Sequence, residues 1–153
     1  MSDIIASMPF LLQGAVITLQ VTVLAAIFGT IIGTIFGMGR LSKVPFLRIP
    51  SSIYIEFVRG TPLLVQIYII YFGLPSLGID LPPFTAAVVA LSINAGAYTA
   101  EIVRAGIQSI SRGQTEAARS LGMTVWQTMR YIILPQAFRN ILPALGNEFI
   151  ALT

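Results

Sequence analysis

Four polar residues lie inside otherwise hydrophobic stretches of the chain and could bind a charged solute. Glu148 has Asn147 beside it and apolar flanks, while Asn94 and Tyr98 lie four residues apart in an earlier stretch. Residues at that spacing share one face of a helix, and an ionisable group inside a membrane segment is a candidate functional group by default. Glu148 is therefore a candidate to hold the amino group of an amino acid or the side chain of a cationic one. The alternative is that Glu148 hydrogen-bonds another helix or lies near the membrane surface.

The side chains that most enzymes use for nucleophilic or metal chemistry are missing. The chain has no cysteine and no histidine, which excludes disulfides, thiolate or imidazole metal ligands, and imidazole catalysis. The remaining acids and hydroxyls form no nucleophile–base pattern. Lys43 is the only lysine, and no nucleotide-binding G-x-x-x-x-G-K-[ST] loop surrounds it. We therefore predict that the chain is not an enzyme, and we expect no metal or cofactor site in it.

The composition indicates a membrane protein. Hydrophobic residues make up 56% of the 153-residue chain and charged residues only 10%, whereas soluble domains average about 25% charged residues. No charge occurs between Asp3 and Arg40, and a helix needs only about 20 apolar residues to span a bilayer. This first stretch does not resemble a cleavable signal peptide, because its apolar run is too long and no positive residue precedes it.

The hydrophobic pattern predicts an all-α protein with three complete membrane-spanning helices and the start of a fourth. The second helix must begin before Pro62 and kink there, since its cleanly apolar part spans only about 18 Å. The predicted segments run from about Phe10 to Met38, from about Pro50 to Gly73, from about Phe84 to Ala105, and from near Phe138 to Thr153.

Small residues recur at four-residue spacing in two of these segments. Such stripes let helices approach closely, and we expect ordinary helix packing rather than a specific dimer seam. The stripes are formed by Gly29, Gly33 and Gly37 and by Ser92, Gly96 and Ala100.

Two acid–base pairs lie three residues apart on predicted helices. Glu56 and Arg59 are expected to neutralise each other near the membrane surface. Glu101 and Arg104 have the same spacing near the end of the third segment, where we expect them to brace the loop that follows.

The positive charges lie in two of the loops. Residues 40–48 carry three positive charges, and residues 104–139 carry five arginines with one acid, whereas the N-terminus and residues 74–83 carry only Asp3 and Asp80. The positive-inside rule predicts that both basic segments are cytoplasmic and that the N-terminus is outside.

The polar segment 108–136 predicts two short helices around a glycine turn. Gln114–Leu121 is rich in helix formers, and Gly122 follows as a C-terminal cap. Thr124 and Gln127 form a capping-box pattern that opens the second helix. We expect that helix to end before Pro135, because the residue before a proline disfavours helical backbone angles.

One interpretation of residues 114–134 is a helix-turn-helix unit, which would make the chain a membrane-anchored regulator that binds DNA or a soluble protein. A DNA-recognition helix needs basic or amide side chains that reach base edges. Here the second helix offers mainly apolar side chains, with Arg130 as its only basic residue. We therefore expect no nucleic-acid partner.

A second interpretation follows from a longer pattern. The segment 116–135 resembles the cytoplasmic loop motif of bacterial ABC-transporter permeases at every motif position: Glu116, Ala117, Ala118, Gly122, Ile132, Leu134 and Pro135. The stretches EFVRGTPLLVQ (Glu56–Gln66) and NAGAYTAEIVRAGI (Asn94–Ile107) resemble the polar-amino-acid branch of that family. Such permeases usually have five spanning helices. The resemblance thus implies that residues 1–153 form a single, partial permease domain, from a fragment or from a truncated gene.

The resemblance also implies roles and partners. Segment 108–136 would be the coupling loop that docks on a cytoplasmic ABC ATPase dimer, with Glu116, Ala117 and Ala118 at the contact and Gly122 as the bend. ATP and magnesium would be bound by that ATPase. A solute-binding protein outside the bacterial inner membrane would deliver a polar amino acid, and a second permease subunit, a copy or a homologue, would complete the path. Asn94, Tyr98, Asn147 and Glu148 are the candidate path residues.

Overall fold

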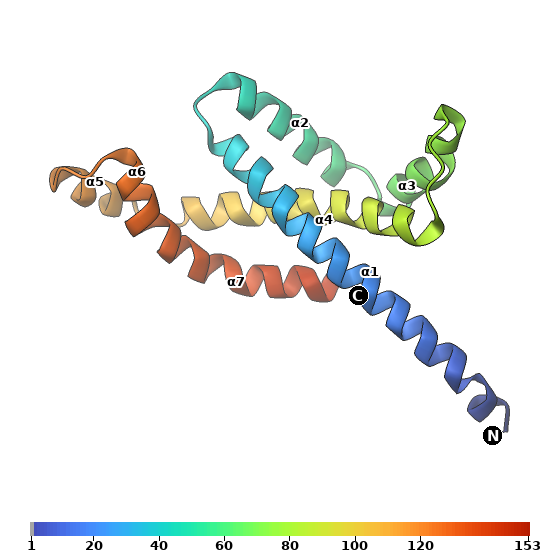
Figure 1. The fold of residues 1–153 in the computed structure, drawn as a ribbon. Helices are drawn as coiled ribbons and strands as arrows, with labels where there is room; N and C mark the ends of the chain where they lie inside the picture. Colours follow the sequence, from blue (N-terminus) through green and yellow to red (C-terminus); the bar gives the residue numbers. More distant parts are fainter. Residues whose placement is uncertain (1) are drawn as a thin grey trace.

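The computed structural model describes the backbone of residues 2–153 and the side chains of residues 7–153. Asp3, which contributes to the predicted orientation, lies outside the described side chains. Within the described part the chain is helical and has no strand (Figure 1). The segments are α1 (Ser2–Leu41), α2 (Pro45–Gly60), α3 (Leu63–Tyr68), η1 (Ile69–Gly73), η2 (Leu74–Leu77), α4 (Pro83–Gln108), α5 (Arg112–Ser120), α6 (Val125–Thr128), η3 (Met129–Ile133) and α7 (Leu134–Ala151).

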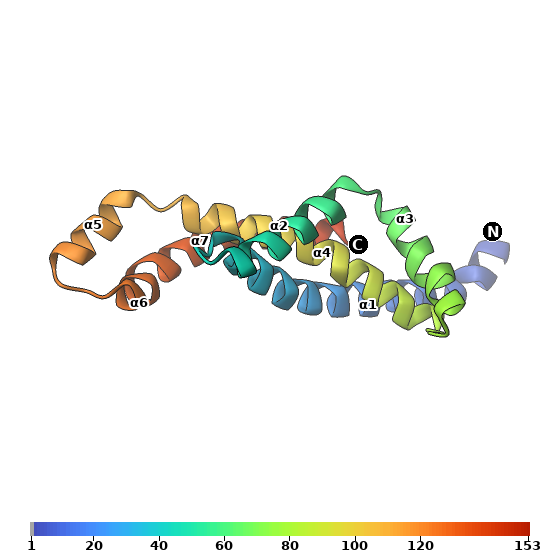
Figure 2. The same ribbon diagram turned by 90° about the horizontal axis from the view of Figure 1, so that it is seen from above.

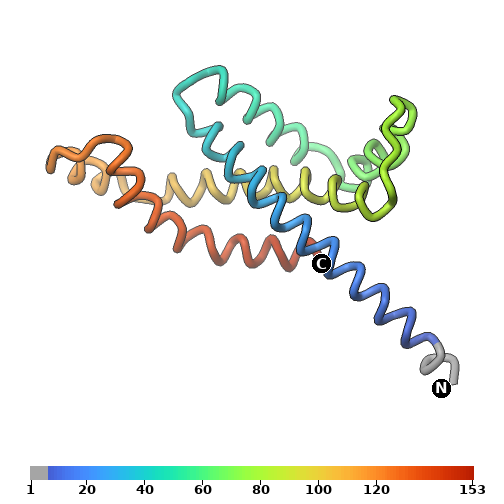
Figure 3. The backbone as a smooth tube through the Cα atoms, in the orientation of Figure 1, coloured from blue at the N-terminus to red at the C-terminus, as the bar shows by residue number. Residues whose placement is uncertain are grey.

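Helix α4 is the centre of the fold, because α1, α2, α3 and α7 all contact it. Figure 2 shows an elongated arrangement in which α5 and α6 project from one end, while α3 and the start of α1 lie toward the other. The tube in Figure 3 shows that the turn between α1 and α2 lies in the same half of the molecule as α5 and α6. The two basic segments of the sequence therefore lie on the same side of the helical core.

The two small-residue stripes form the contact between α1 and α4. A Cβ atom added at Gly29 would lie 2.8 Å from the Ala95 Cβ, and one added at Gly37 would lie 2.7 Å from the Ala100 carbonyl oxygen. Gly96 approaches Ile32 equally closely from the other side. These distances are shorter than real Cβ contacts, so the helices approach along glycine surfaces. The prediction that the stripes serve ordinary helix packing is confirmed.

By length and composition, α1 from Ser7 to Leu41 and α4 can each cross a membrane. A third crossing is possible if α2 and the segment Leu63–Leu77 count as one span, but these two parts meet at a bend of 107°. The predicted kink at Pro62 is therefore a complete break between two helices. Helix α2 also begins at Pro45 rather than near Pro50, because a proline in the first helical turn leaves no helix hydrogen bond unmade.

The expectation that the second helix of segment 108–136 ends before Pro135 is wrong. Helix α6 continues through the π-helical turn η3 into α7, and Pro135 lies in the first turn of α7. The Leu134 amide donates to the Met129 carbonyl oxygen, five residues earlier, as a π-helical turn requires. This wider turn carries the helix past the proline.

The glycine contact predicts a stability difference between two substitutions on α1. In Gly33→Ala the new methyl group would overlap the Thr99 side chain and lie 2.8 Å from the Gly96 carbonyl oxygen. Overpacking of this kind costs about 1–3 kcal/mol, so we expect a lower thermal midpoint for the purified protein in detergent. Gly14→Ala is the control, because a Cβ atom there meets nothing within 4 Å. Equal midpoints for the two variants would contradict this account of the α1–α4 contact.

Candidate functional site

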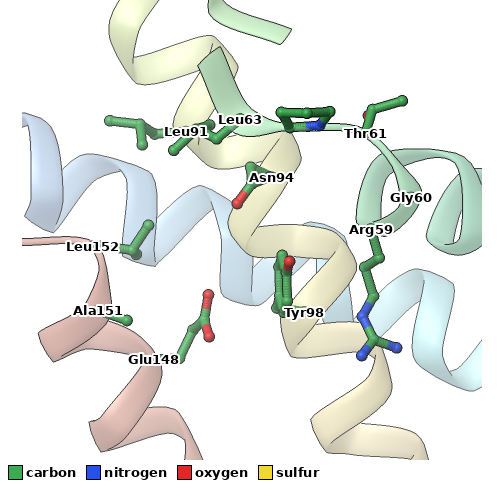
Figure 4. Close-up of a pocket in the computed structure, with 11 residues that line it drawn as sticks. Arg59, Gly60, Thr61, Leu63, Leu91, Asn94, Tyr98, Glu148, Ala151 and Leu152 are labelled. Carbon is green, nitrogen blue, oxygen red and sulfur yellow. The ribbon is translucent and has the colours of Figure 1, made fainter. Parts of the chain in front are cut away.

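An open cavity of about 590 Å³ lies between the α2–α3 break, α4 and α7 (Figure 4). Three of the four predicted path residues, Asn94, Tyr98 and Glu148, line it. Figure 4 shows the Glu148 carboxylate and the Asn94 side-chain oxygen directed into the space between α7 and α4. The remaining lining residues are Arg59, Gly60, Thr61, Pro62, Leu63, Leu91, Ala151 and Leu152.

The fourth predicted residue, Asn147, does not line the cavity and is exposed. Consecutive residues of a helix point about 100° apart, and here Glu148 lines the cavity whereas Asn147 does not. A role for Asn147 elsewhere in the path stays a prediction.

The backbone break that lines the cavity is held by Gln66, a residue to which the sequence analysis assigned no role. Its Nε2 donates to the Val58 carbonyl oxygen at 2.8 Å, to the Thr61 carbonyl oxygen at 3.1 Å and to Thr61 Oγ1 at 2.9 Å. Its Oε1 accepts from Asn94 Nδ2 at 3.1 Å. An amide side chain within the apolar run LLVQIYII was the available signal.

Arg59 lies beside Tyr98 rather than beside Glu56. Its guanidinium carbon is 5.3 Å from the centre of the Tyr98 ring, within the range of a cation–π interaction. Glu56 instead pairs with Arg40 of α1, with an Nη2–Oε1 distance of 2.8 Å. The predicted neutralisation of Glu56 by Arg59 is therefore wrong: the turn between α1 and α2 brings another cation to Glu56, and Arg59 faces the cavity.

Charged side chains connect three helices close to the α1–α2 turn. Arg40 of α1 contacts Glu56 of α2 and, at 3.4 Å, Glu101 of α4. Glu101 also pairs with Arg104, as its spacing predicted. Arg104 in turn donates to Gln108, the last residue of α4. The pair therefore stabilises the end of α4 from which the chain continues toward α5.

The predicted caps of segment 108–136 are confirmed. Gly122 has φ +81°, and the Gly122 and Met123 amides donate to the Arg119 and Ala118 carbonyl oxygens, which is the Schellman pattern of a helix end. Thr124 and Gln127 exchange hydrogen bonds in a capping box. Helix α5 itself begins at Arg112, two residues before the predicted start, because Ser111 caps it.

The three residues predicted at a docking contact differ in exposure. Glu116 and Ala117 are exposed, whereas Ala118 is only 3% exposed. The side chain of Ala118 is thus covered by the protein's own chain in this structure, and its contact with a partner stays a prediction. The helix packs inward through the face that bears Ala118, which leaves the face with Glu116 free.

Three large apolar side chains extend this exposed surface. Leu121, Val125 and Trp126 are exposed on and after the turn that joins α5 to α6. Val125 and Trp126 belong to the apolar side chains of the second predicted helix, which argued against DNA binding. Apolar residues on a polar segment outside the spanning helices were the signal that could have assigned them to a partner surface.

Comparison with known proteins gives a consistent result. The family model described as "Binding-protein-dependent transport system inner membrane component" matches residues 27–153. The "Arginine transport system permease protein ArtQ" of Bacillus subtilis (strain 168) is 48% identical, over 99% of this chain and 70% of that protein. The "L-cystine transport system permease protein TcyB" of the same organism is 47% identical, over 94% of this chain and 62% of that protein.

A solved structure described as "Crystal structure of an amino acid ABC transporter with histidines" matches 98% of this chain and 70% of its own chain, with 50% identity and a TM-score of 0.94. This chain therefore spans roughly two thirds of the length of the relatives it matches.

The charged contacts predict different effects for two carboxylates. Glu101→Gln removes the carboxylate that accepts from both Arg40 and Arg104, and hydrogen bonds to charged groups are worth about 1.5–3 kcal/mol. Glu56 is the control, because its side chain is 68% exposed and exposed ion pairs contribute about 0.2–1 kcal/mol. We expect Glu101→Gln to lower the thermal midpoint in detergent clearly more than Glu56→Gln does. The reverse order would show that the contact with Glu101 is unimportant.

Proposed function

The chain belongs to the family of binding-protein-dependent transport system inner membrane components, and on this premise we propose that it is a permease subunit of an ATP-driven importer of polar amino acids. Membership of this family supports a transport role and gives no support to a DNA-binding regulator that uses residues 114–134. The substrate class is inferred from the cavity, because its lining combines the Glu148 carboxylate and the Arg59 guanidinium with neutral polar side chains such as those of Asn94 and Tyr98.

We propose that this cavity is the part of the translocation path that this chain supplies. Its volume of about 590 Å³ is within the range of about 300–1,000 Å³ that is typical of small-molecule sites. Glu148 would hold the ammonium group or a cationic side chain of the amino acid, and Asn94 and Tyr98 would supply neutral hydrogen bonds. The charge of Arg59 is suited to a carboxylate. An amino acid carries both of these groups.

We further propose that α5 is the coupling helix that docks on a separate ATPase dimer, where ATP and magnesium are bound. Glu116 and Ala117 would contact the ATPase, and Leu121, Val125 and Trp126 would add apolar area beside them. Nucleotide-driven closure of the ATPase would move this helix and switch two paired permease subunits between outward- and inward-facing states. The paired subunit would be a copy or a homologue, and a solute-binding protein would deliver the substrate from outside.

The orientation in the bacterial inner membrane is part of the same proposal. Residues 40–48 and 108–136 would be cytoplasmic and the N-terminus outside, as the distribution of positive charge favours. The position of both basic segments in one half of the fold supports this orientation (Figures 1 and 3).

The proposed substrate contact can be tested by Glu148→Gln in the complete protein, assembled with its partner subunits. Loss of a charge-assisted contact of about 1.5–3 kcal/mol corresponds to a roughly tenfold or larger effect on binding. We expect the initial rate of ATP-driven uptake of a radiolabelled amino acid, at a concentration below saturation, to fall at least about tenfold. Asn147→Gln is the matched control, since Asn147 lies outside the cavity. Unchanged uptake by Glu148→Gln at equal membrane abundance would exclude the proposed contact.

The proposed docking role can be tested by Glu116→Lys. We expect normal membrane insertion but loss of ATPase copurification and of uptake, because the exposed charge at the contact is reversed. Gln114→Lys adds a positive charge on the same helix, two residues away and about 200° around its axis, and should copurify with the ATPase normally. If Glu116→Lys retained the ATPase and transported at the normal rate, α5 would not be the coupling helix.

A further inference from the structure

We propose that Gln66, which does not itself line the cavity, sets the hydrogen-bonding character of the cavity wall by fixing the orientation of the Asn94 amide. In this orientation the wall presents an acceptor, which suits the ammonium group of a ligand. The inference rests on the proposed function only in taking that ligand to be an amino acid. Gln66 is thus a positioning residue that acts through Asn94.

The first step is the break between α2 and α3. Helix α2 ends at Gly60, and the chain turns through 107° before α3 begins at Leu63. Pro62 has no amide hydrogen to donate. The carbonyl oxygens of Val58 and Thr61 therefore need donors from elsewhere, because unsatisfied backbone groups are costly inside a membrane. Thr61 N and Thr61 Oγ1 reach the Val58 oxygen only at 3.4 Å and 3.3 Å, so the Gln66 Nε2 contact at 2.8 Å is the shortest of the three.

The second step is that these acceptors fix Gln66. Backbone carbonyl oxygens can only accept, so the Gln66 end that faces them must be the NH₂ group. Its two nearest contacts, at 2.8 Å to Val58 and 2.9 Å to Thr61 Oγ1, agree with that orientation. The reversed amide would place Oε1 against two carbonyl oxygens. Gln66 is only 8% exposed, so water has little access to compensate for such a reversal.

The third step transfers this orientation to α4. With its NH₂ group at the break, Gln66 presents the acceptor Oε1 to Asn94. The Asn94 atom that faces it must therefore be the donor Nδ2, which lies at 3.1 Å. Asn94 is also only 8% exposed. The other end of its amide, the carbonyl oxygen, is therefore left for the cavity, and Figure 4 shows this oxygen directed into the space opposite Glu148.

The consequence is a choice of ligand chemistry. Two oxygen acceptors, from Asn94 and Glu148, face the same part of the cavity, which favours an ammonium group with its three N–H donors. A reversed Asn94 amide would present a donor there and would repel the ammonium group. The break in the backbone thus orients the Gln66 amide, and Gln66 orients the Asn94 amide. Through these two contacts it determines that this wall of the cavity accepts the ammonium group of an amino acid and not the carboxylate.

The inference is tested with two substitutions that retain the length of Gln66. Gln66→Met removes the acceptor for Asn94, so the Asn94 amide is free to reverse. We expect the dissociation constant of a radiolabelled amino acid for the purified permease–ATPase complex to rise about tenfold. Gln66→Glu in its neutral form, which burial against carbonyl oxygens favours, keeps an O–H donor for the Val58 carbonyl oxygen and an oxygen acceptor for Asn94, and should bind within about threefold of the wild type. The probe is whichever of arginine, glutamine or histidine the wild-type transporter carries.

A purely structural role for Gln66 predicts a different result when Asn94 is also changed. If Gln66 only held the break, Asn94→Asp could not restore binding to Gln66→Met, because the Val58 and Thr61 carbonyl oxygens would still lack the Gln66 donor. Such a result would overturn the inference, as would wild-type affinity in Gln66→Met. If Gln66→Met does not assemble, Gln66→Glu alone decides, since a tenfold loss of affinity in that variant contradicts the inference.

A rescue experiment isolates the orientation of Asn94. Adding Asn94→Asp to Gln66→Met places an oxygen on both sides of residue 94, so orientation no longer matters. We expect the double variant to recover to within about threefold of the wild type, and no recovery would count against the inference. Gln13→Met makes the same glutamine-to-methionine change at an exposed position of α1 and is the control, with affinity expected to equal that of the wild type.

The proposed function and the inference fail in different ways. A wild-type complex without ATP-driven uptake would refute the proposed function, whereas uptake without saturable binding to the complex would refute the inference.

Discussion

The constraint on which this structure depends is the need to satisfy backbone hydrogen bonds where a helix is broken inside an apolar environment. Water is absent there, so each freed carbonyl group must find a donor within the protein. The chain meets this need between α2 and α3 with two side chains: Gln66 donates to the Val58 and Thr61 carbonyl oxygens, and the Thr61 hydroxyl contacts the Phe57 and Val58 carbonyl oxygens. The break then exposes polar backbone toward α7, and the cavity lies at this point. Irregular backbone at membrane depth is tolerated where it lines such a cavity.

The position of this cavity is fixed by a contact of a different kind. Helices α1 and α4 approach along glycine surfaces, and the same face of α4 is reached by Tyr54, which donates to the Ile93 carbonyl oxygen at 2.6 Å. Helix α4 is therefore held on this face both by close packing and by a hydrogen bond. Asn94 and Tyr98 line the cavity from this helix.

Local patterns in the sequence predicted the parts of the structure that depend on neighbouring residues. The Gly122 cap and the Thr124–Gln127 capping box each involve atoms within one or two helical turns. The small-residue stripes are also visible as spacing within single helices, although they meet across α1 and α4. The predicted cavity residues Asn94, Tyr98 and Glu148 were found because polar groups in apolar helices are rare.

Contacts between segments that are distant in the sequence could not be predicted from such local patterns. Glu56 has Arg59 at a favourable spacing but pairs with Arg40, because the turn after α1 brings the Arg40 guanidinium to 2.8 Å from the Glu56 carboxylate. Gln66 gains its role only when the helix is bent by 107°, which the kink expected at Pro62 did not suggest. Pro135 indicated a helix end, yet a π-helical turn carried the helix past it. In each case tertiary geometry overrode a sound local preference.

The uninterrupted passage of α6 through η3 into α7 has a mechanical meaning. From Val125 to Glu148 the chain is helical without a break, about 35 Å long at 1.5 Å per residue, with Pro143 inside α7. One end carries exposed apolar side chains, and the other carries the carboxylate in the cavity. A continuous helix connects these two ends directly, and the π-helical turn and Pro143 are the points at which it can bend. Had Pro135 ended the helix as expected, a flexible joint at that point would have separated them.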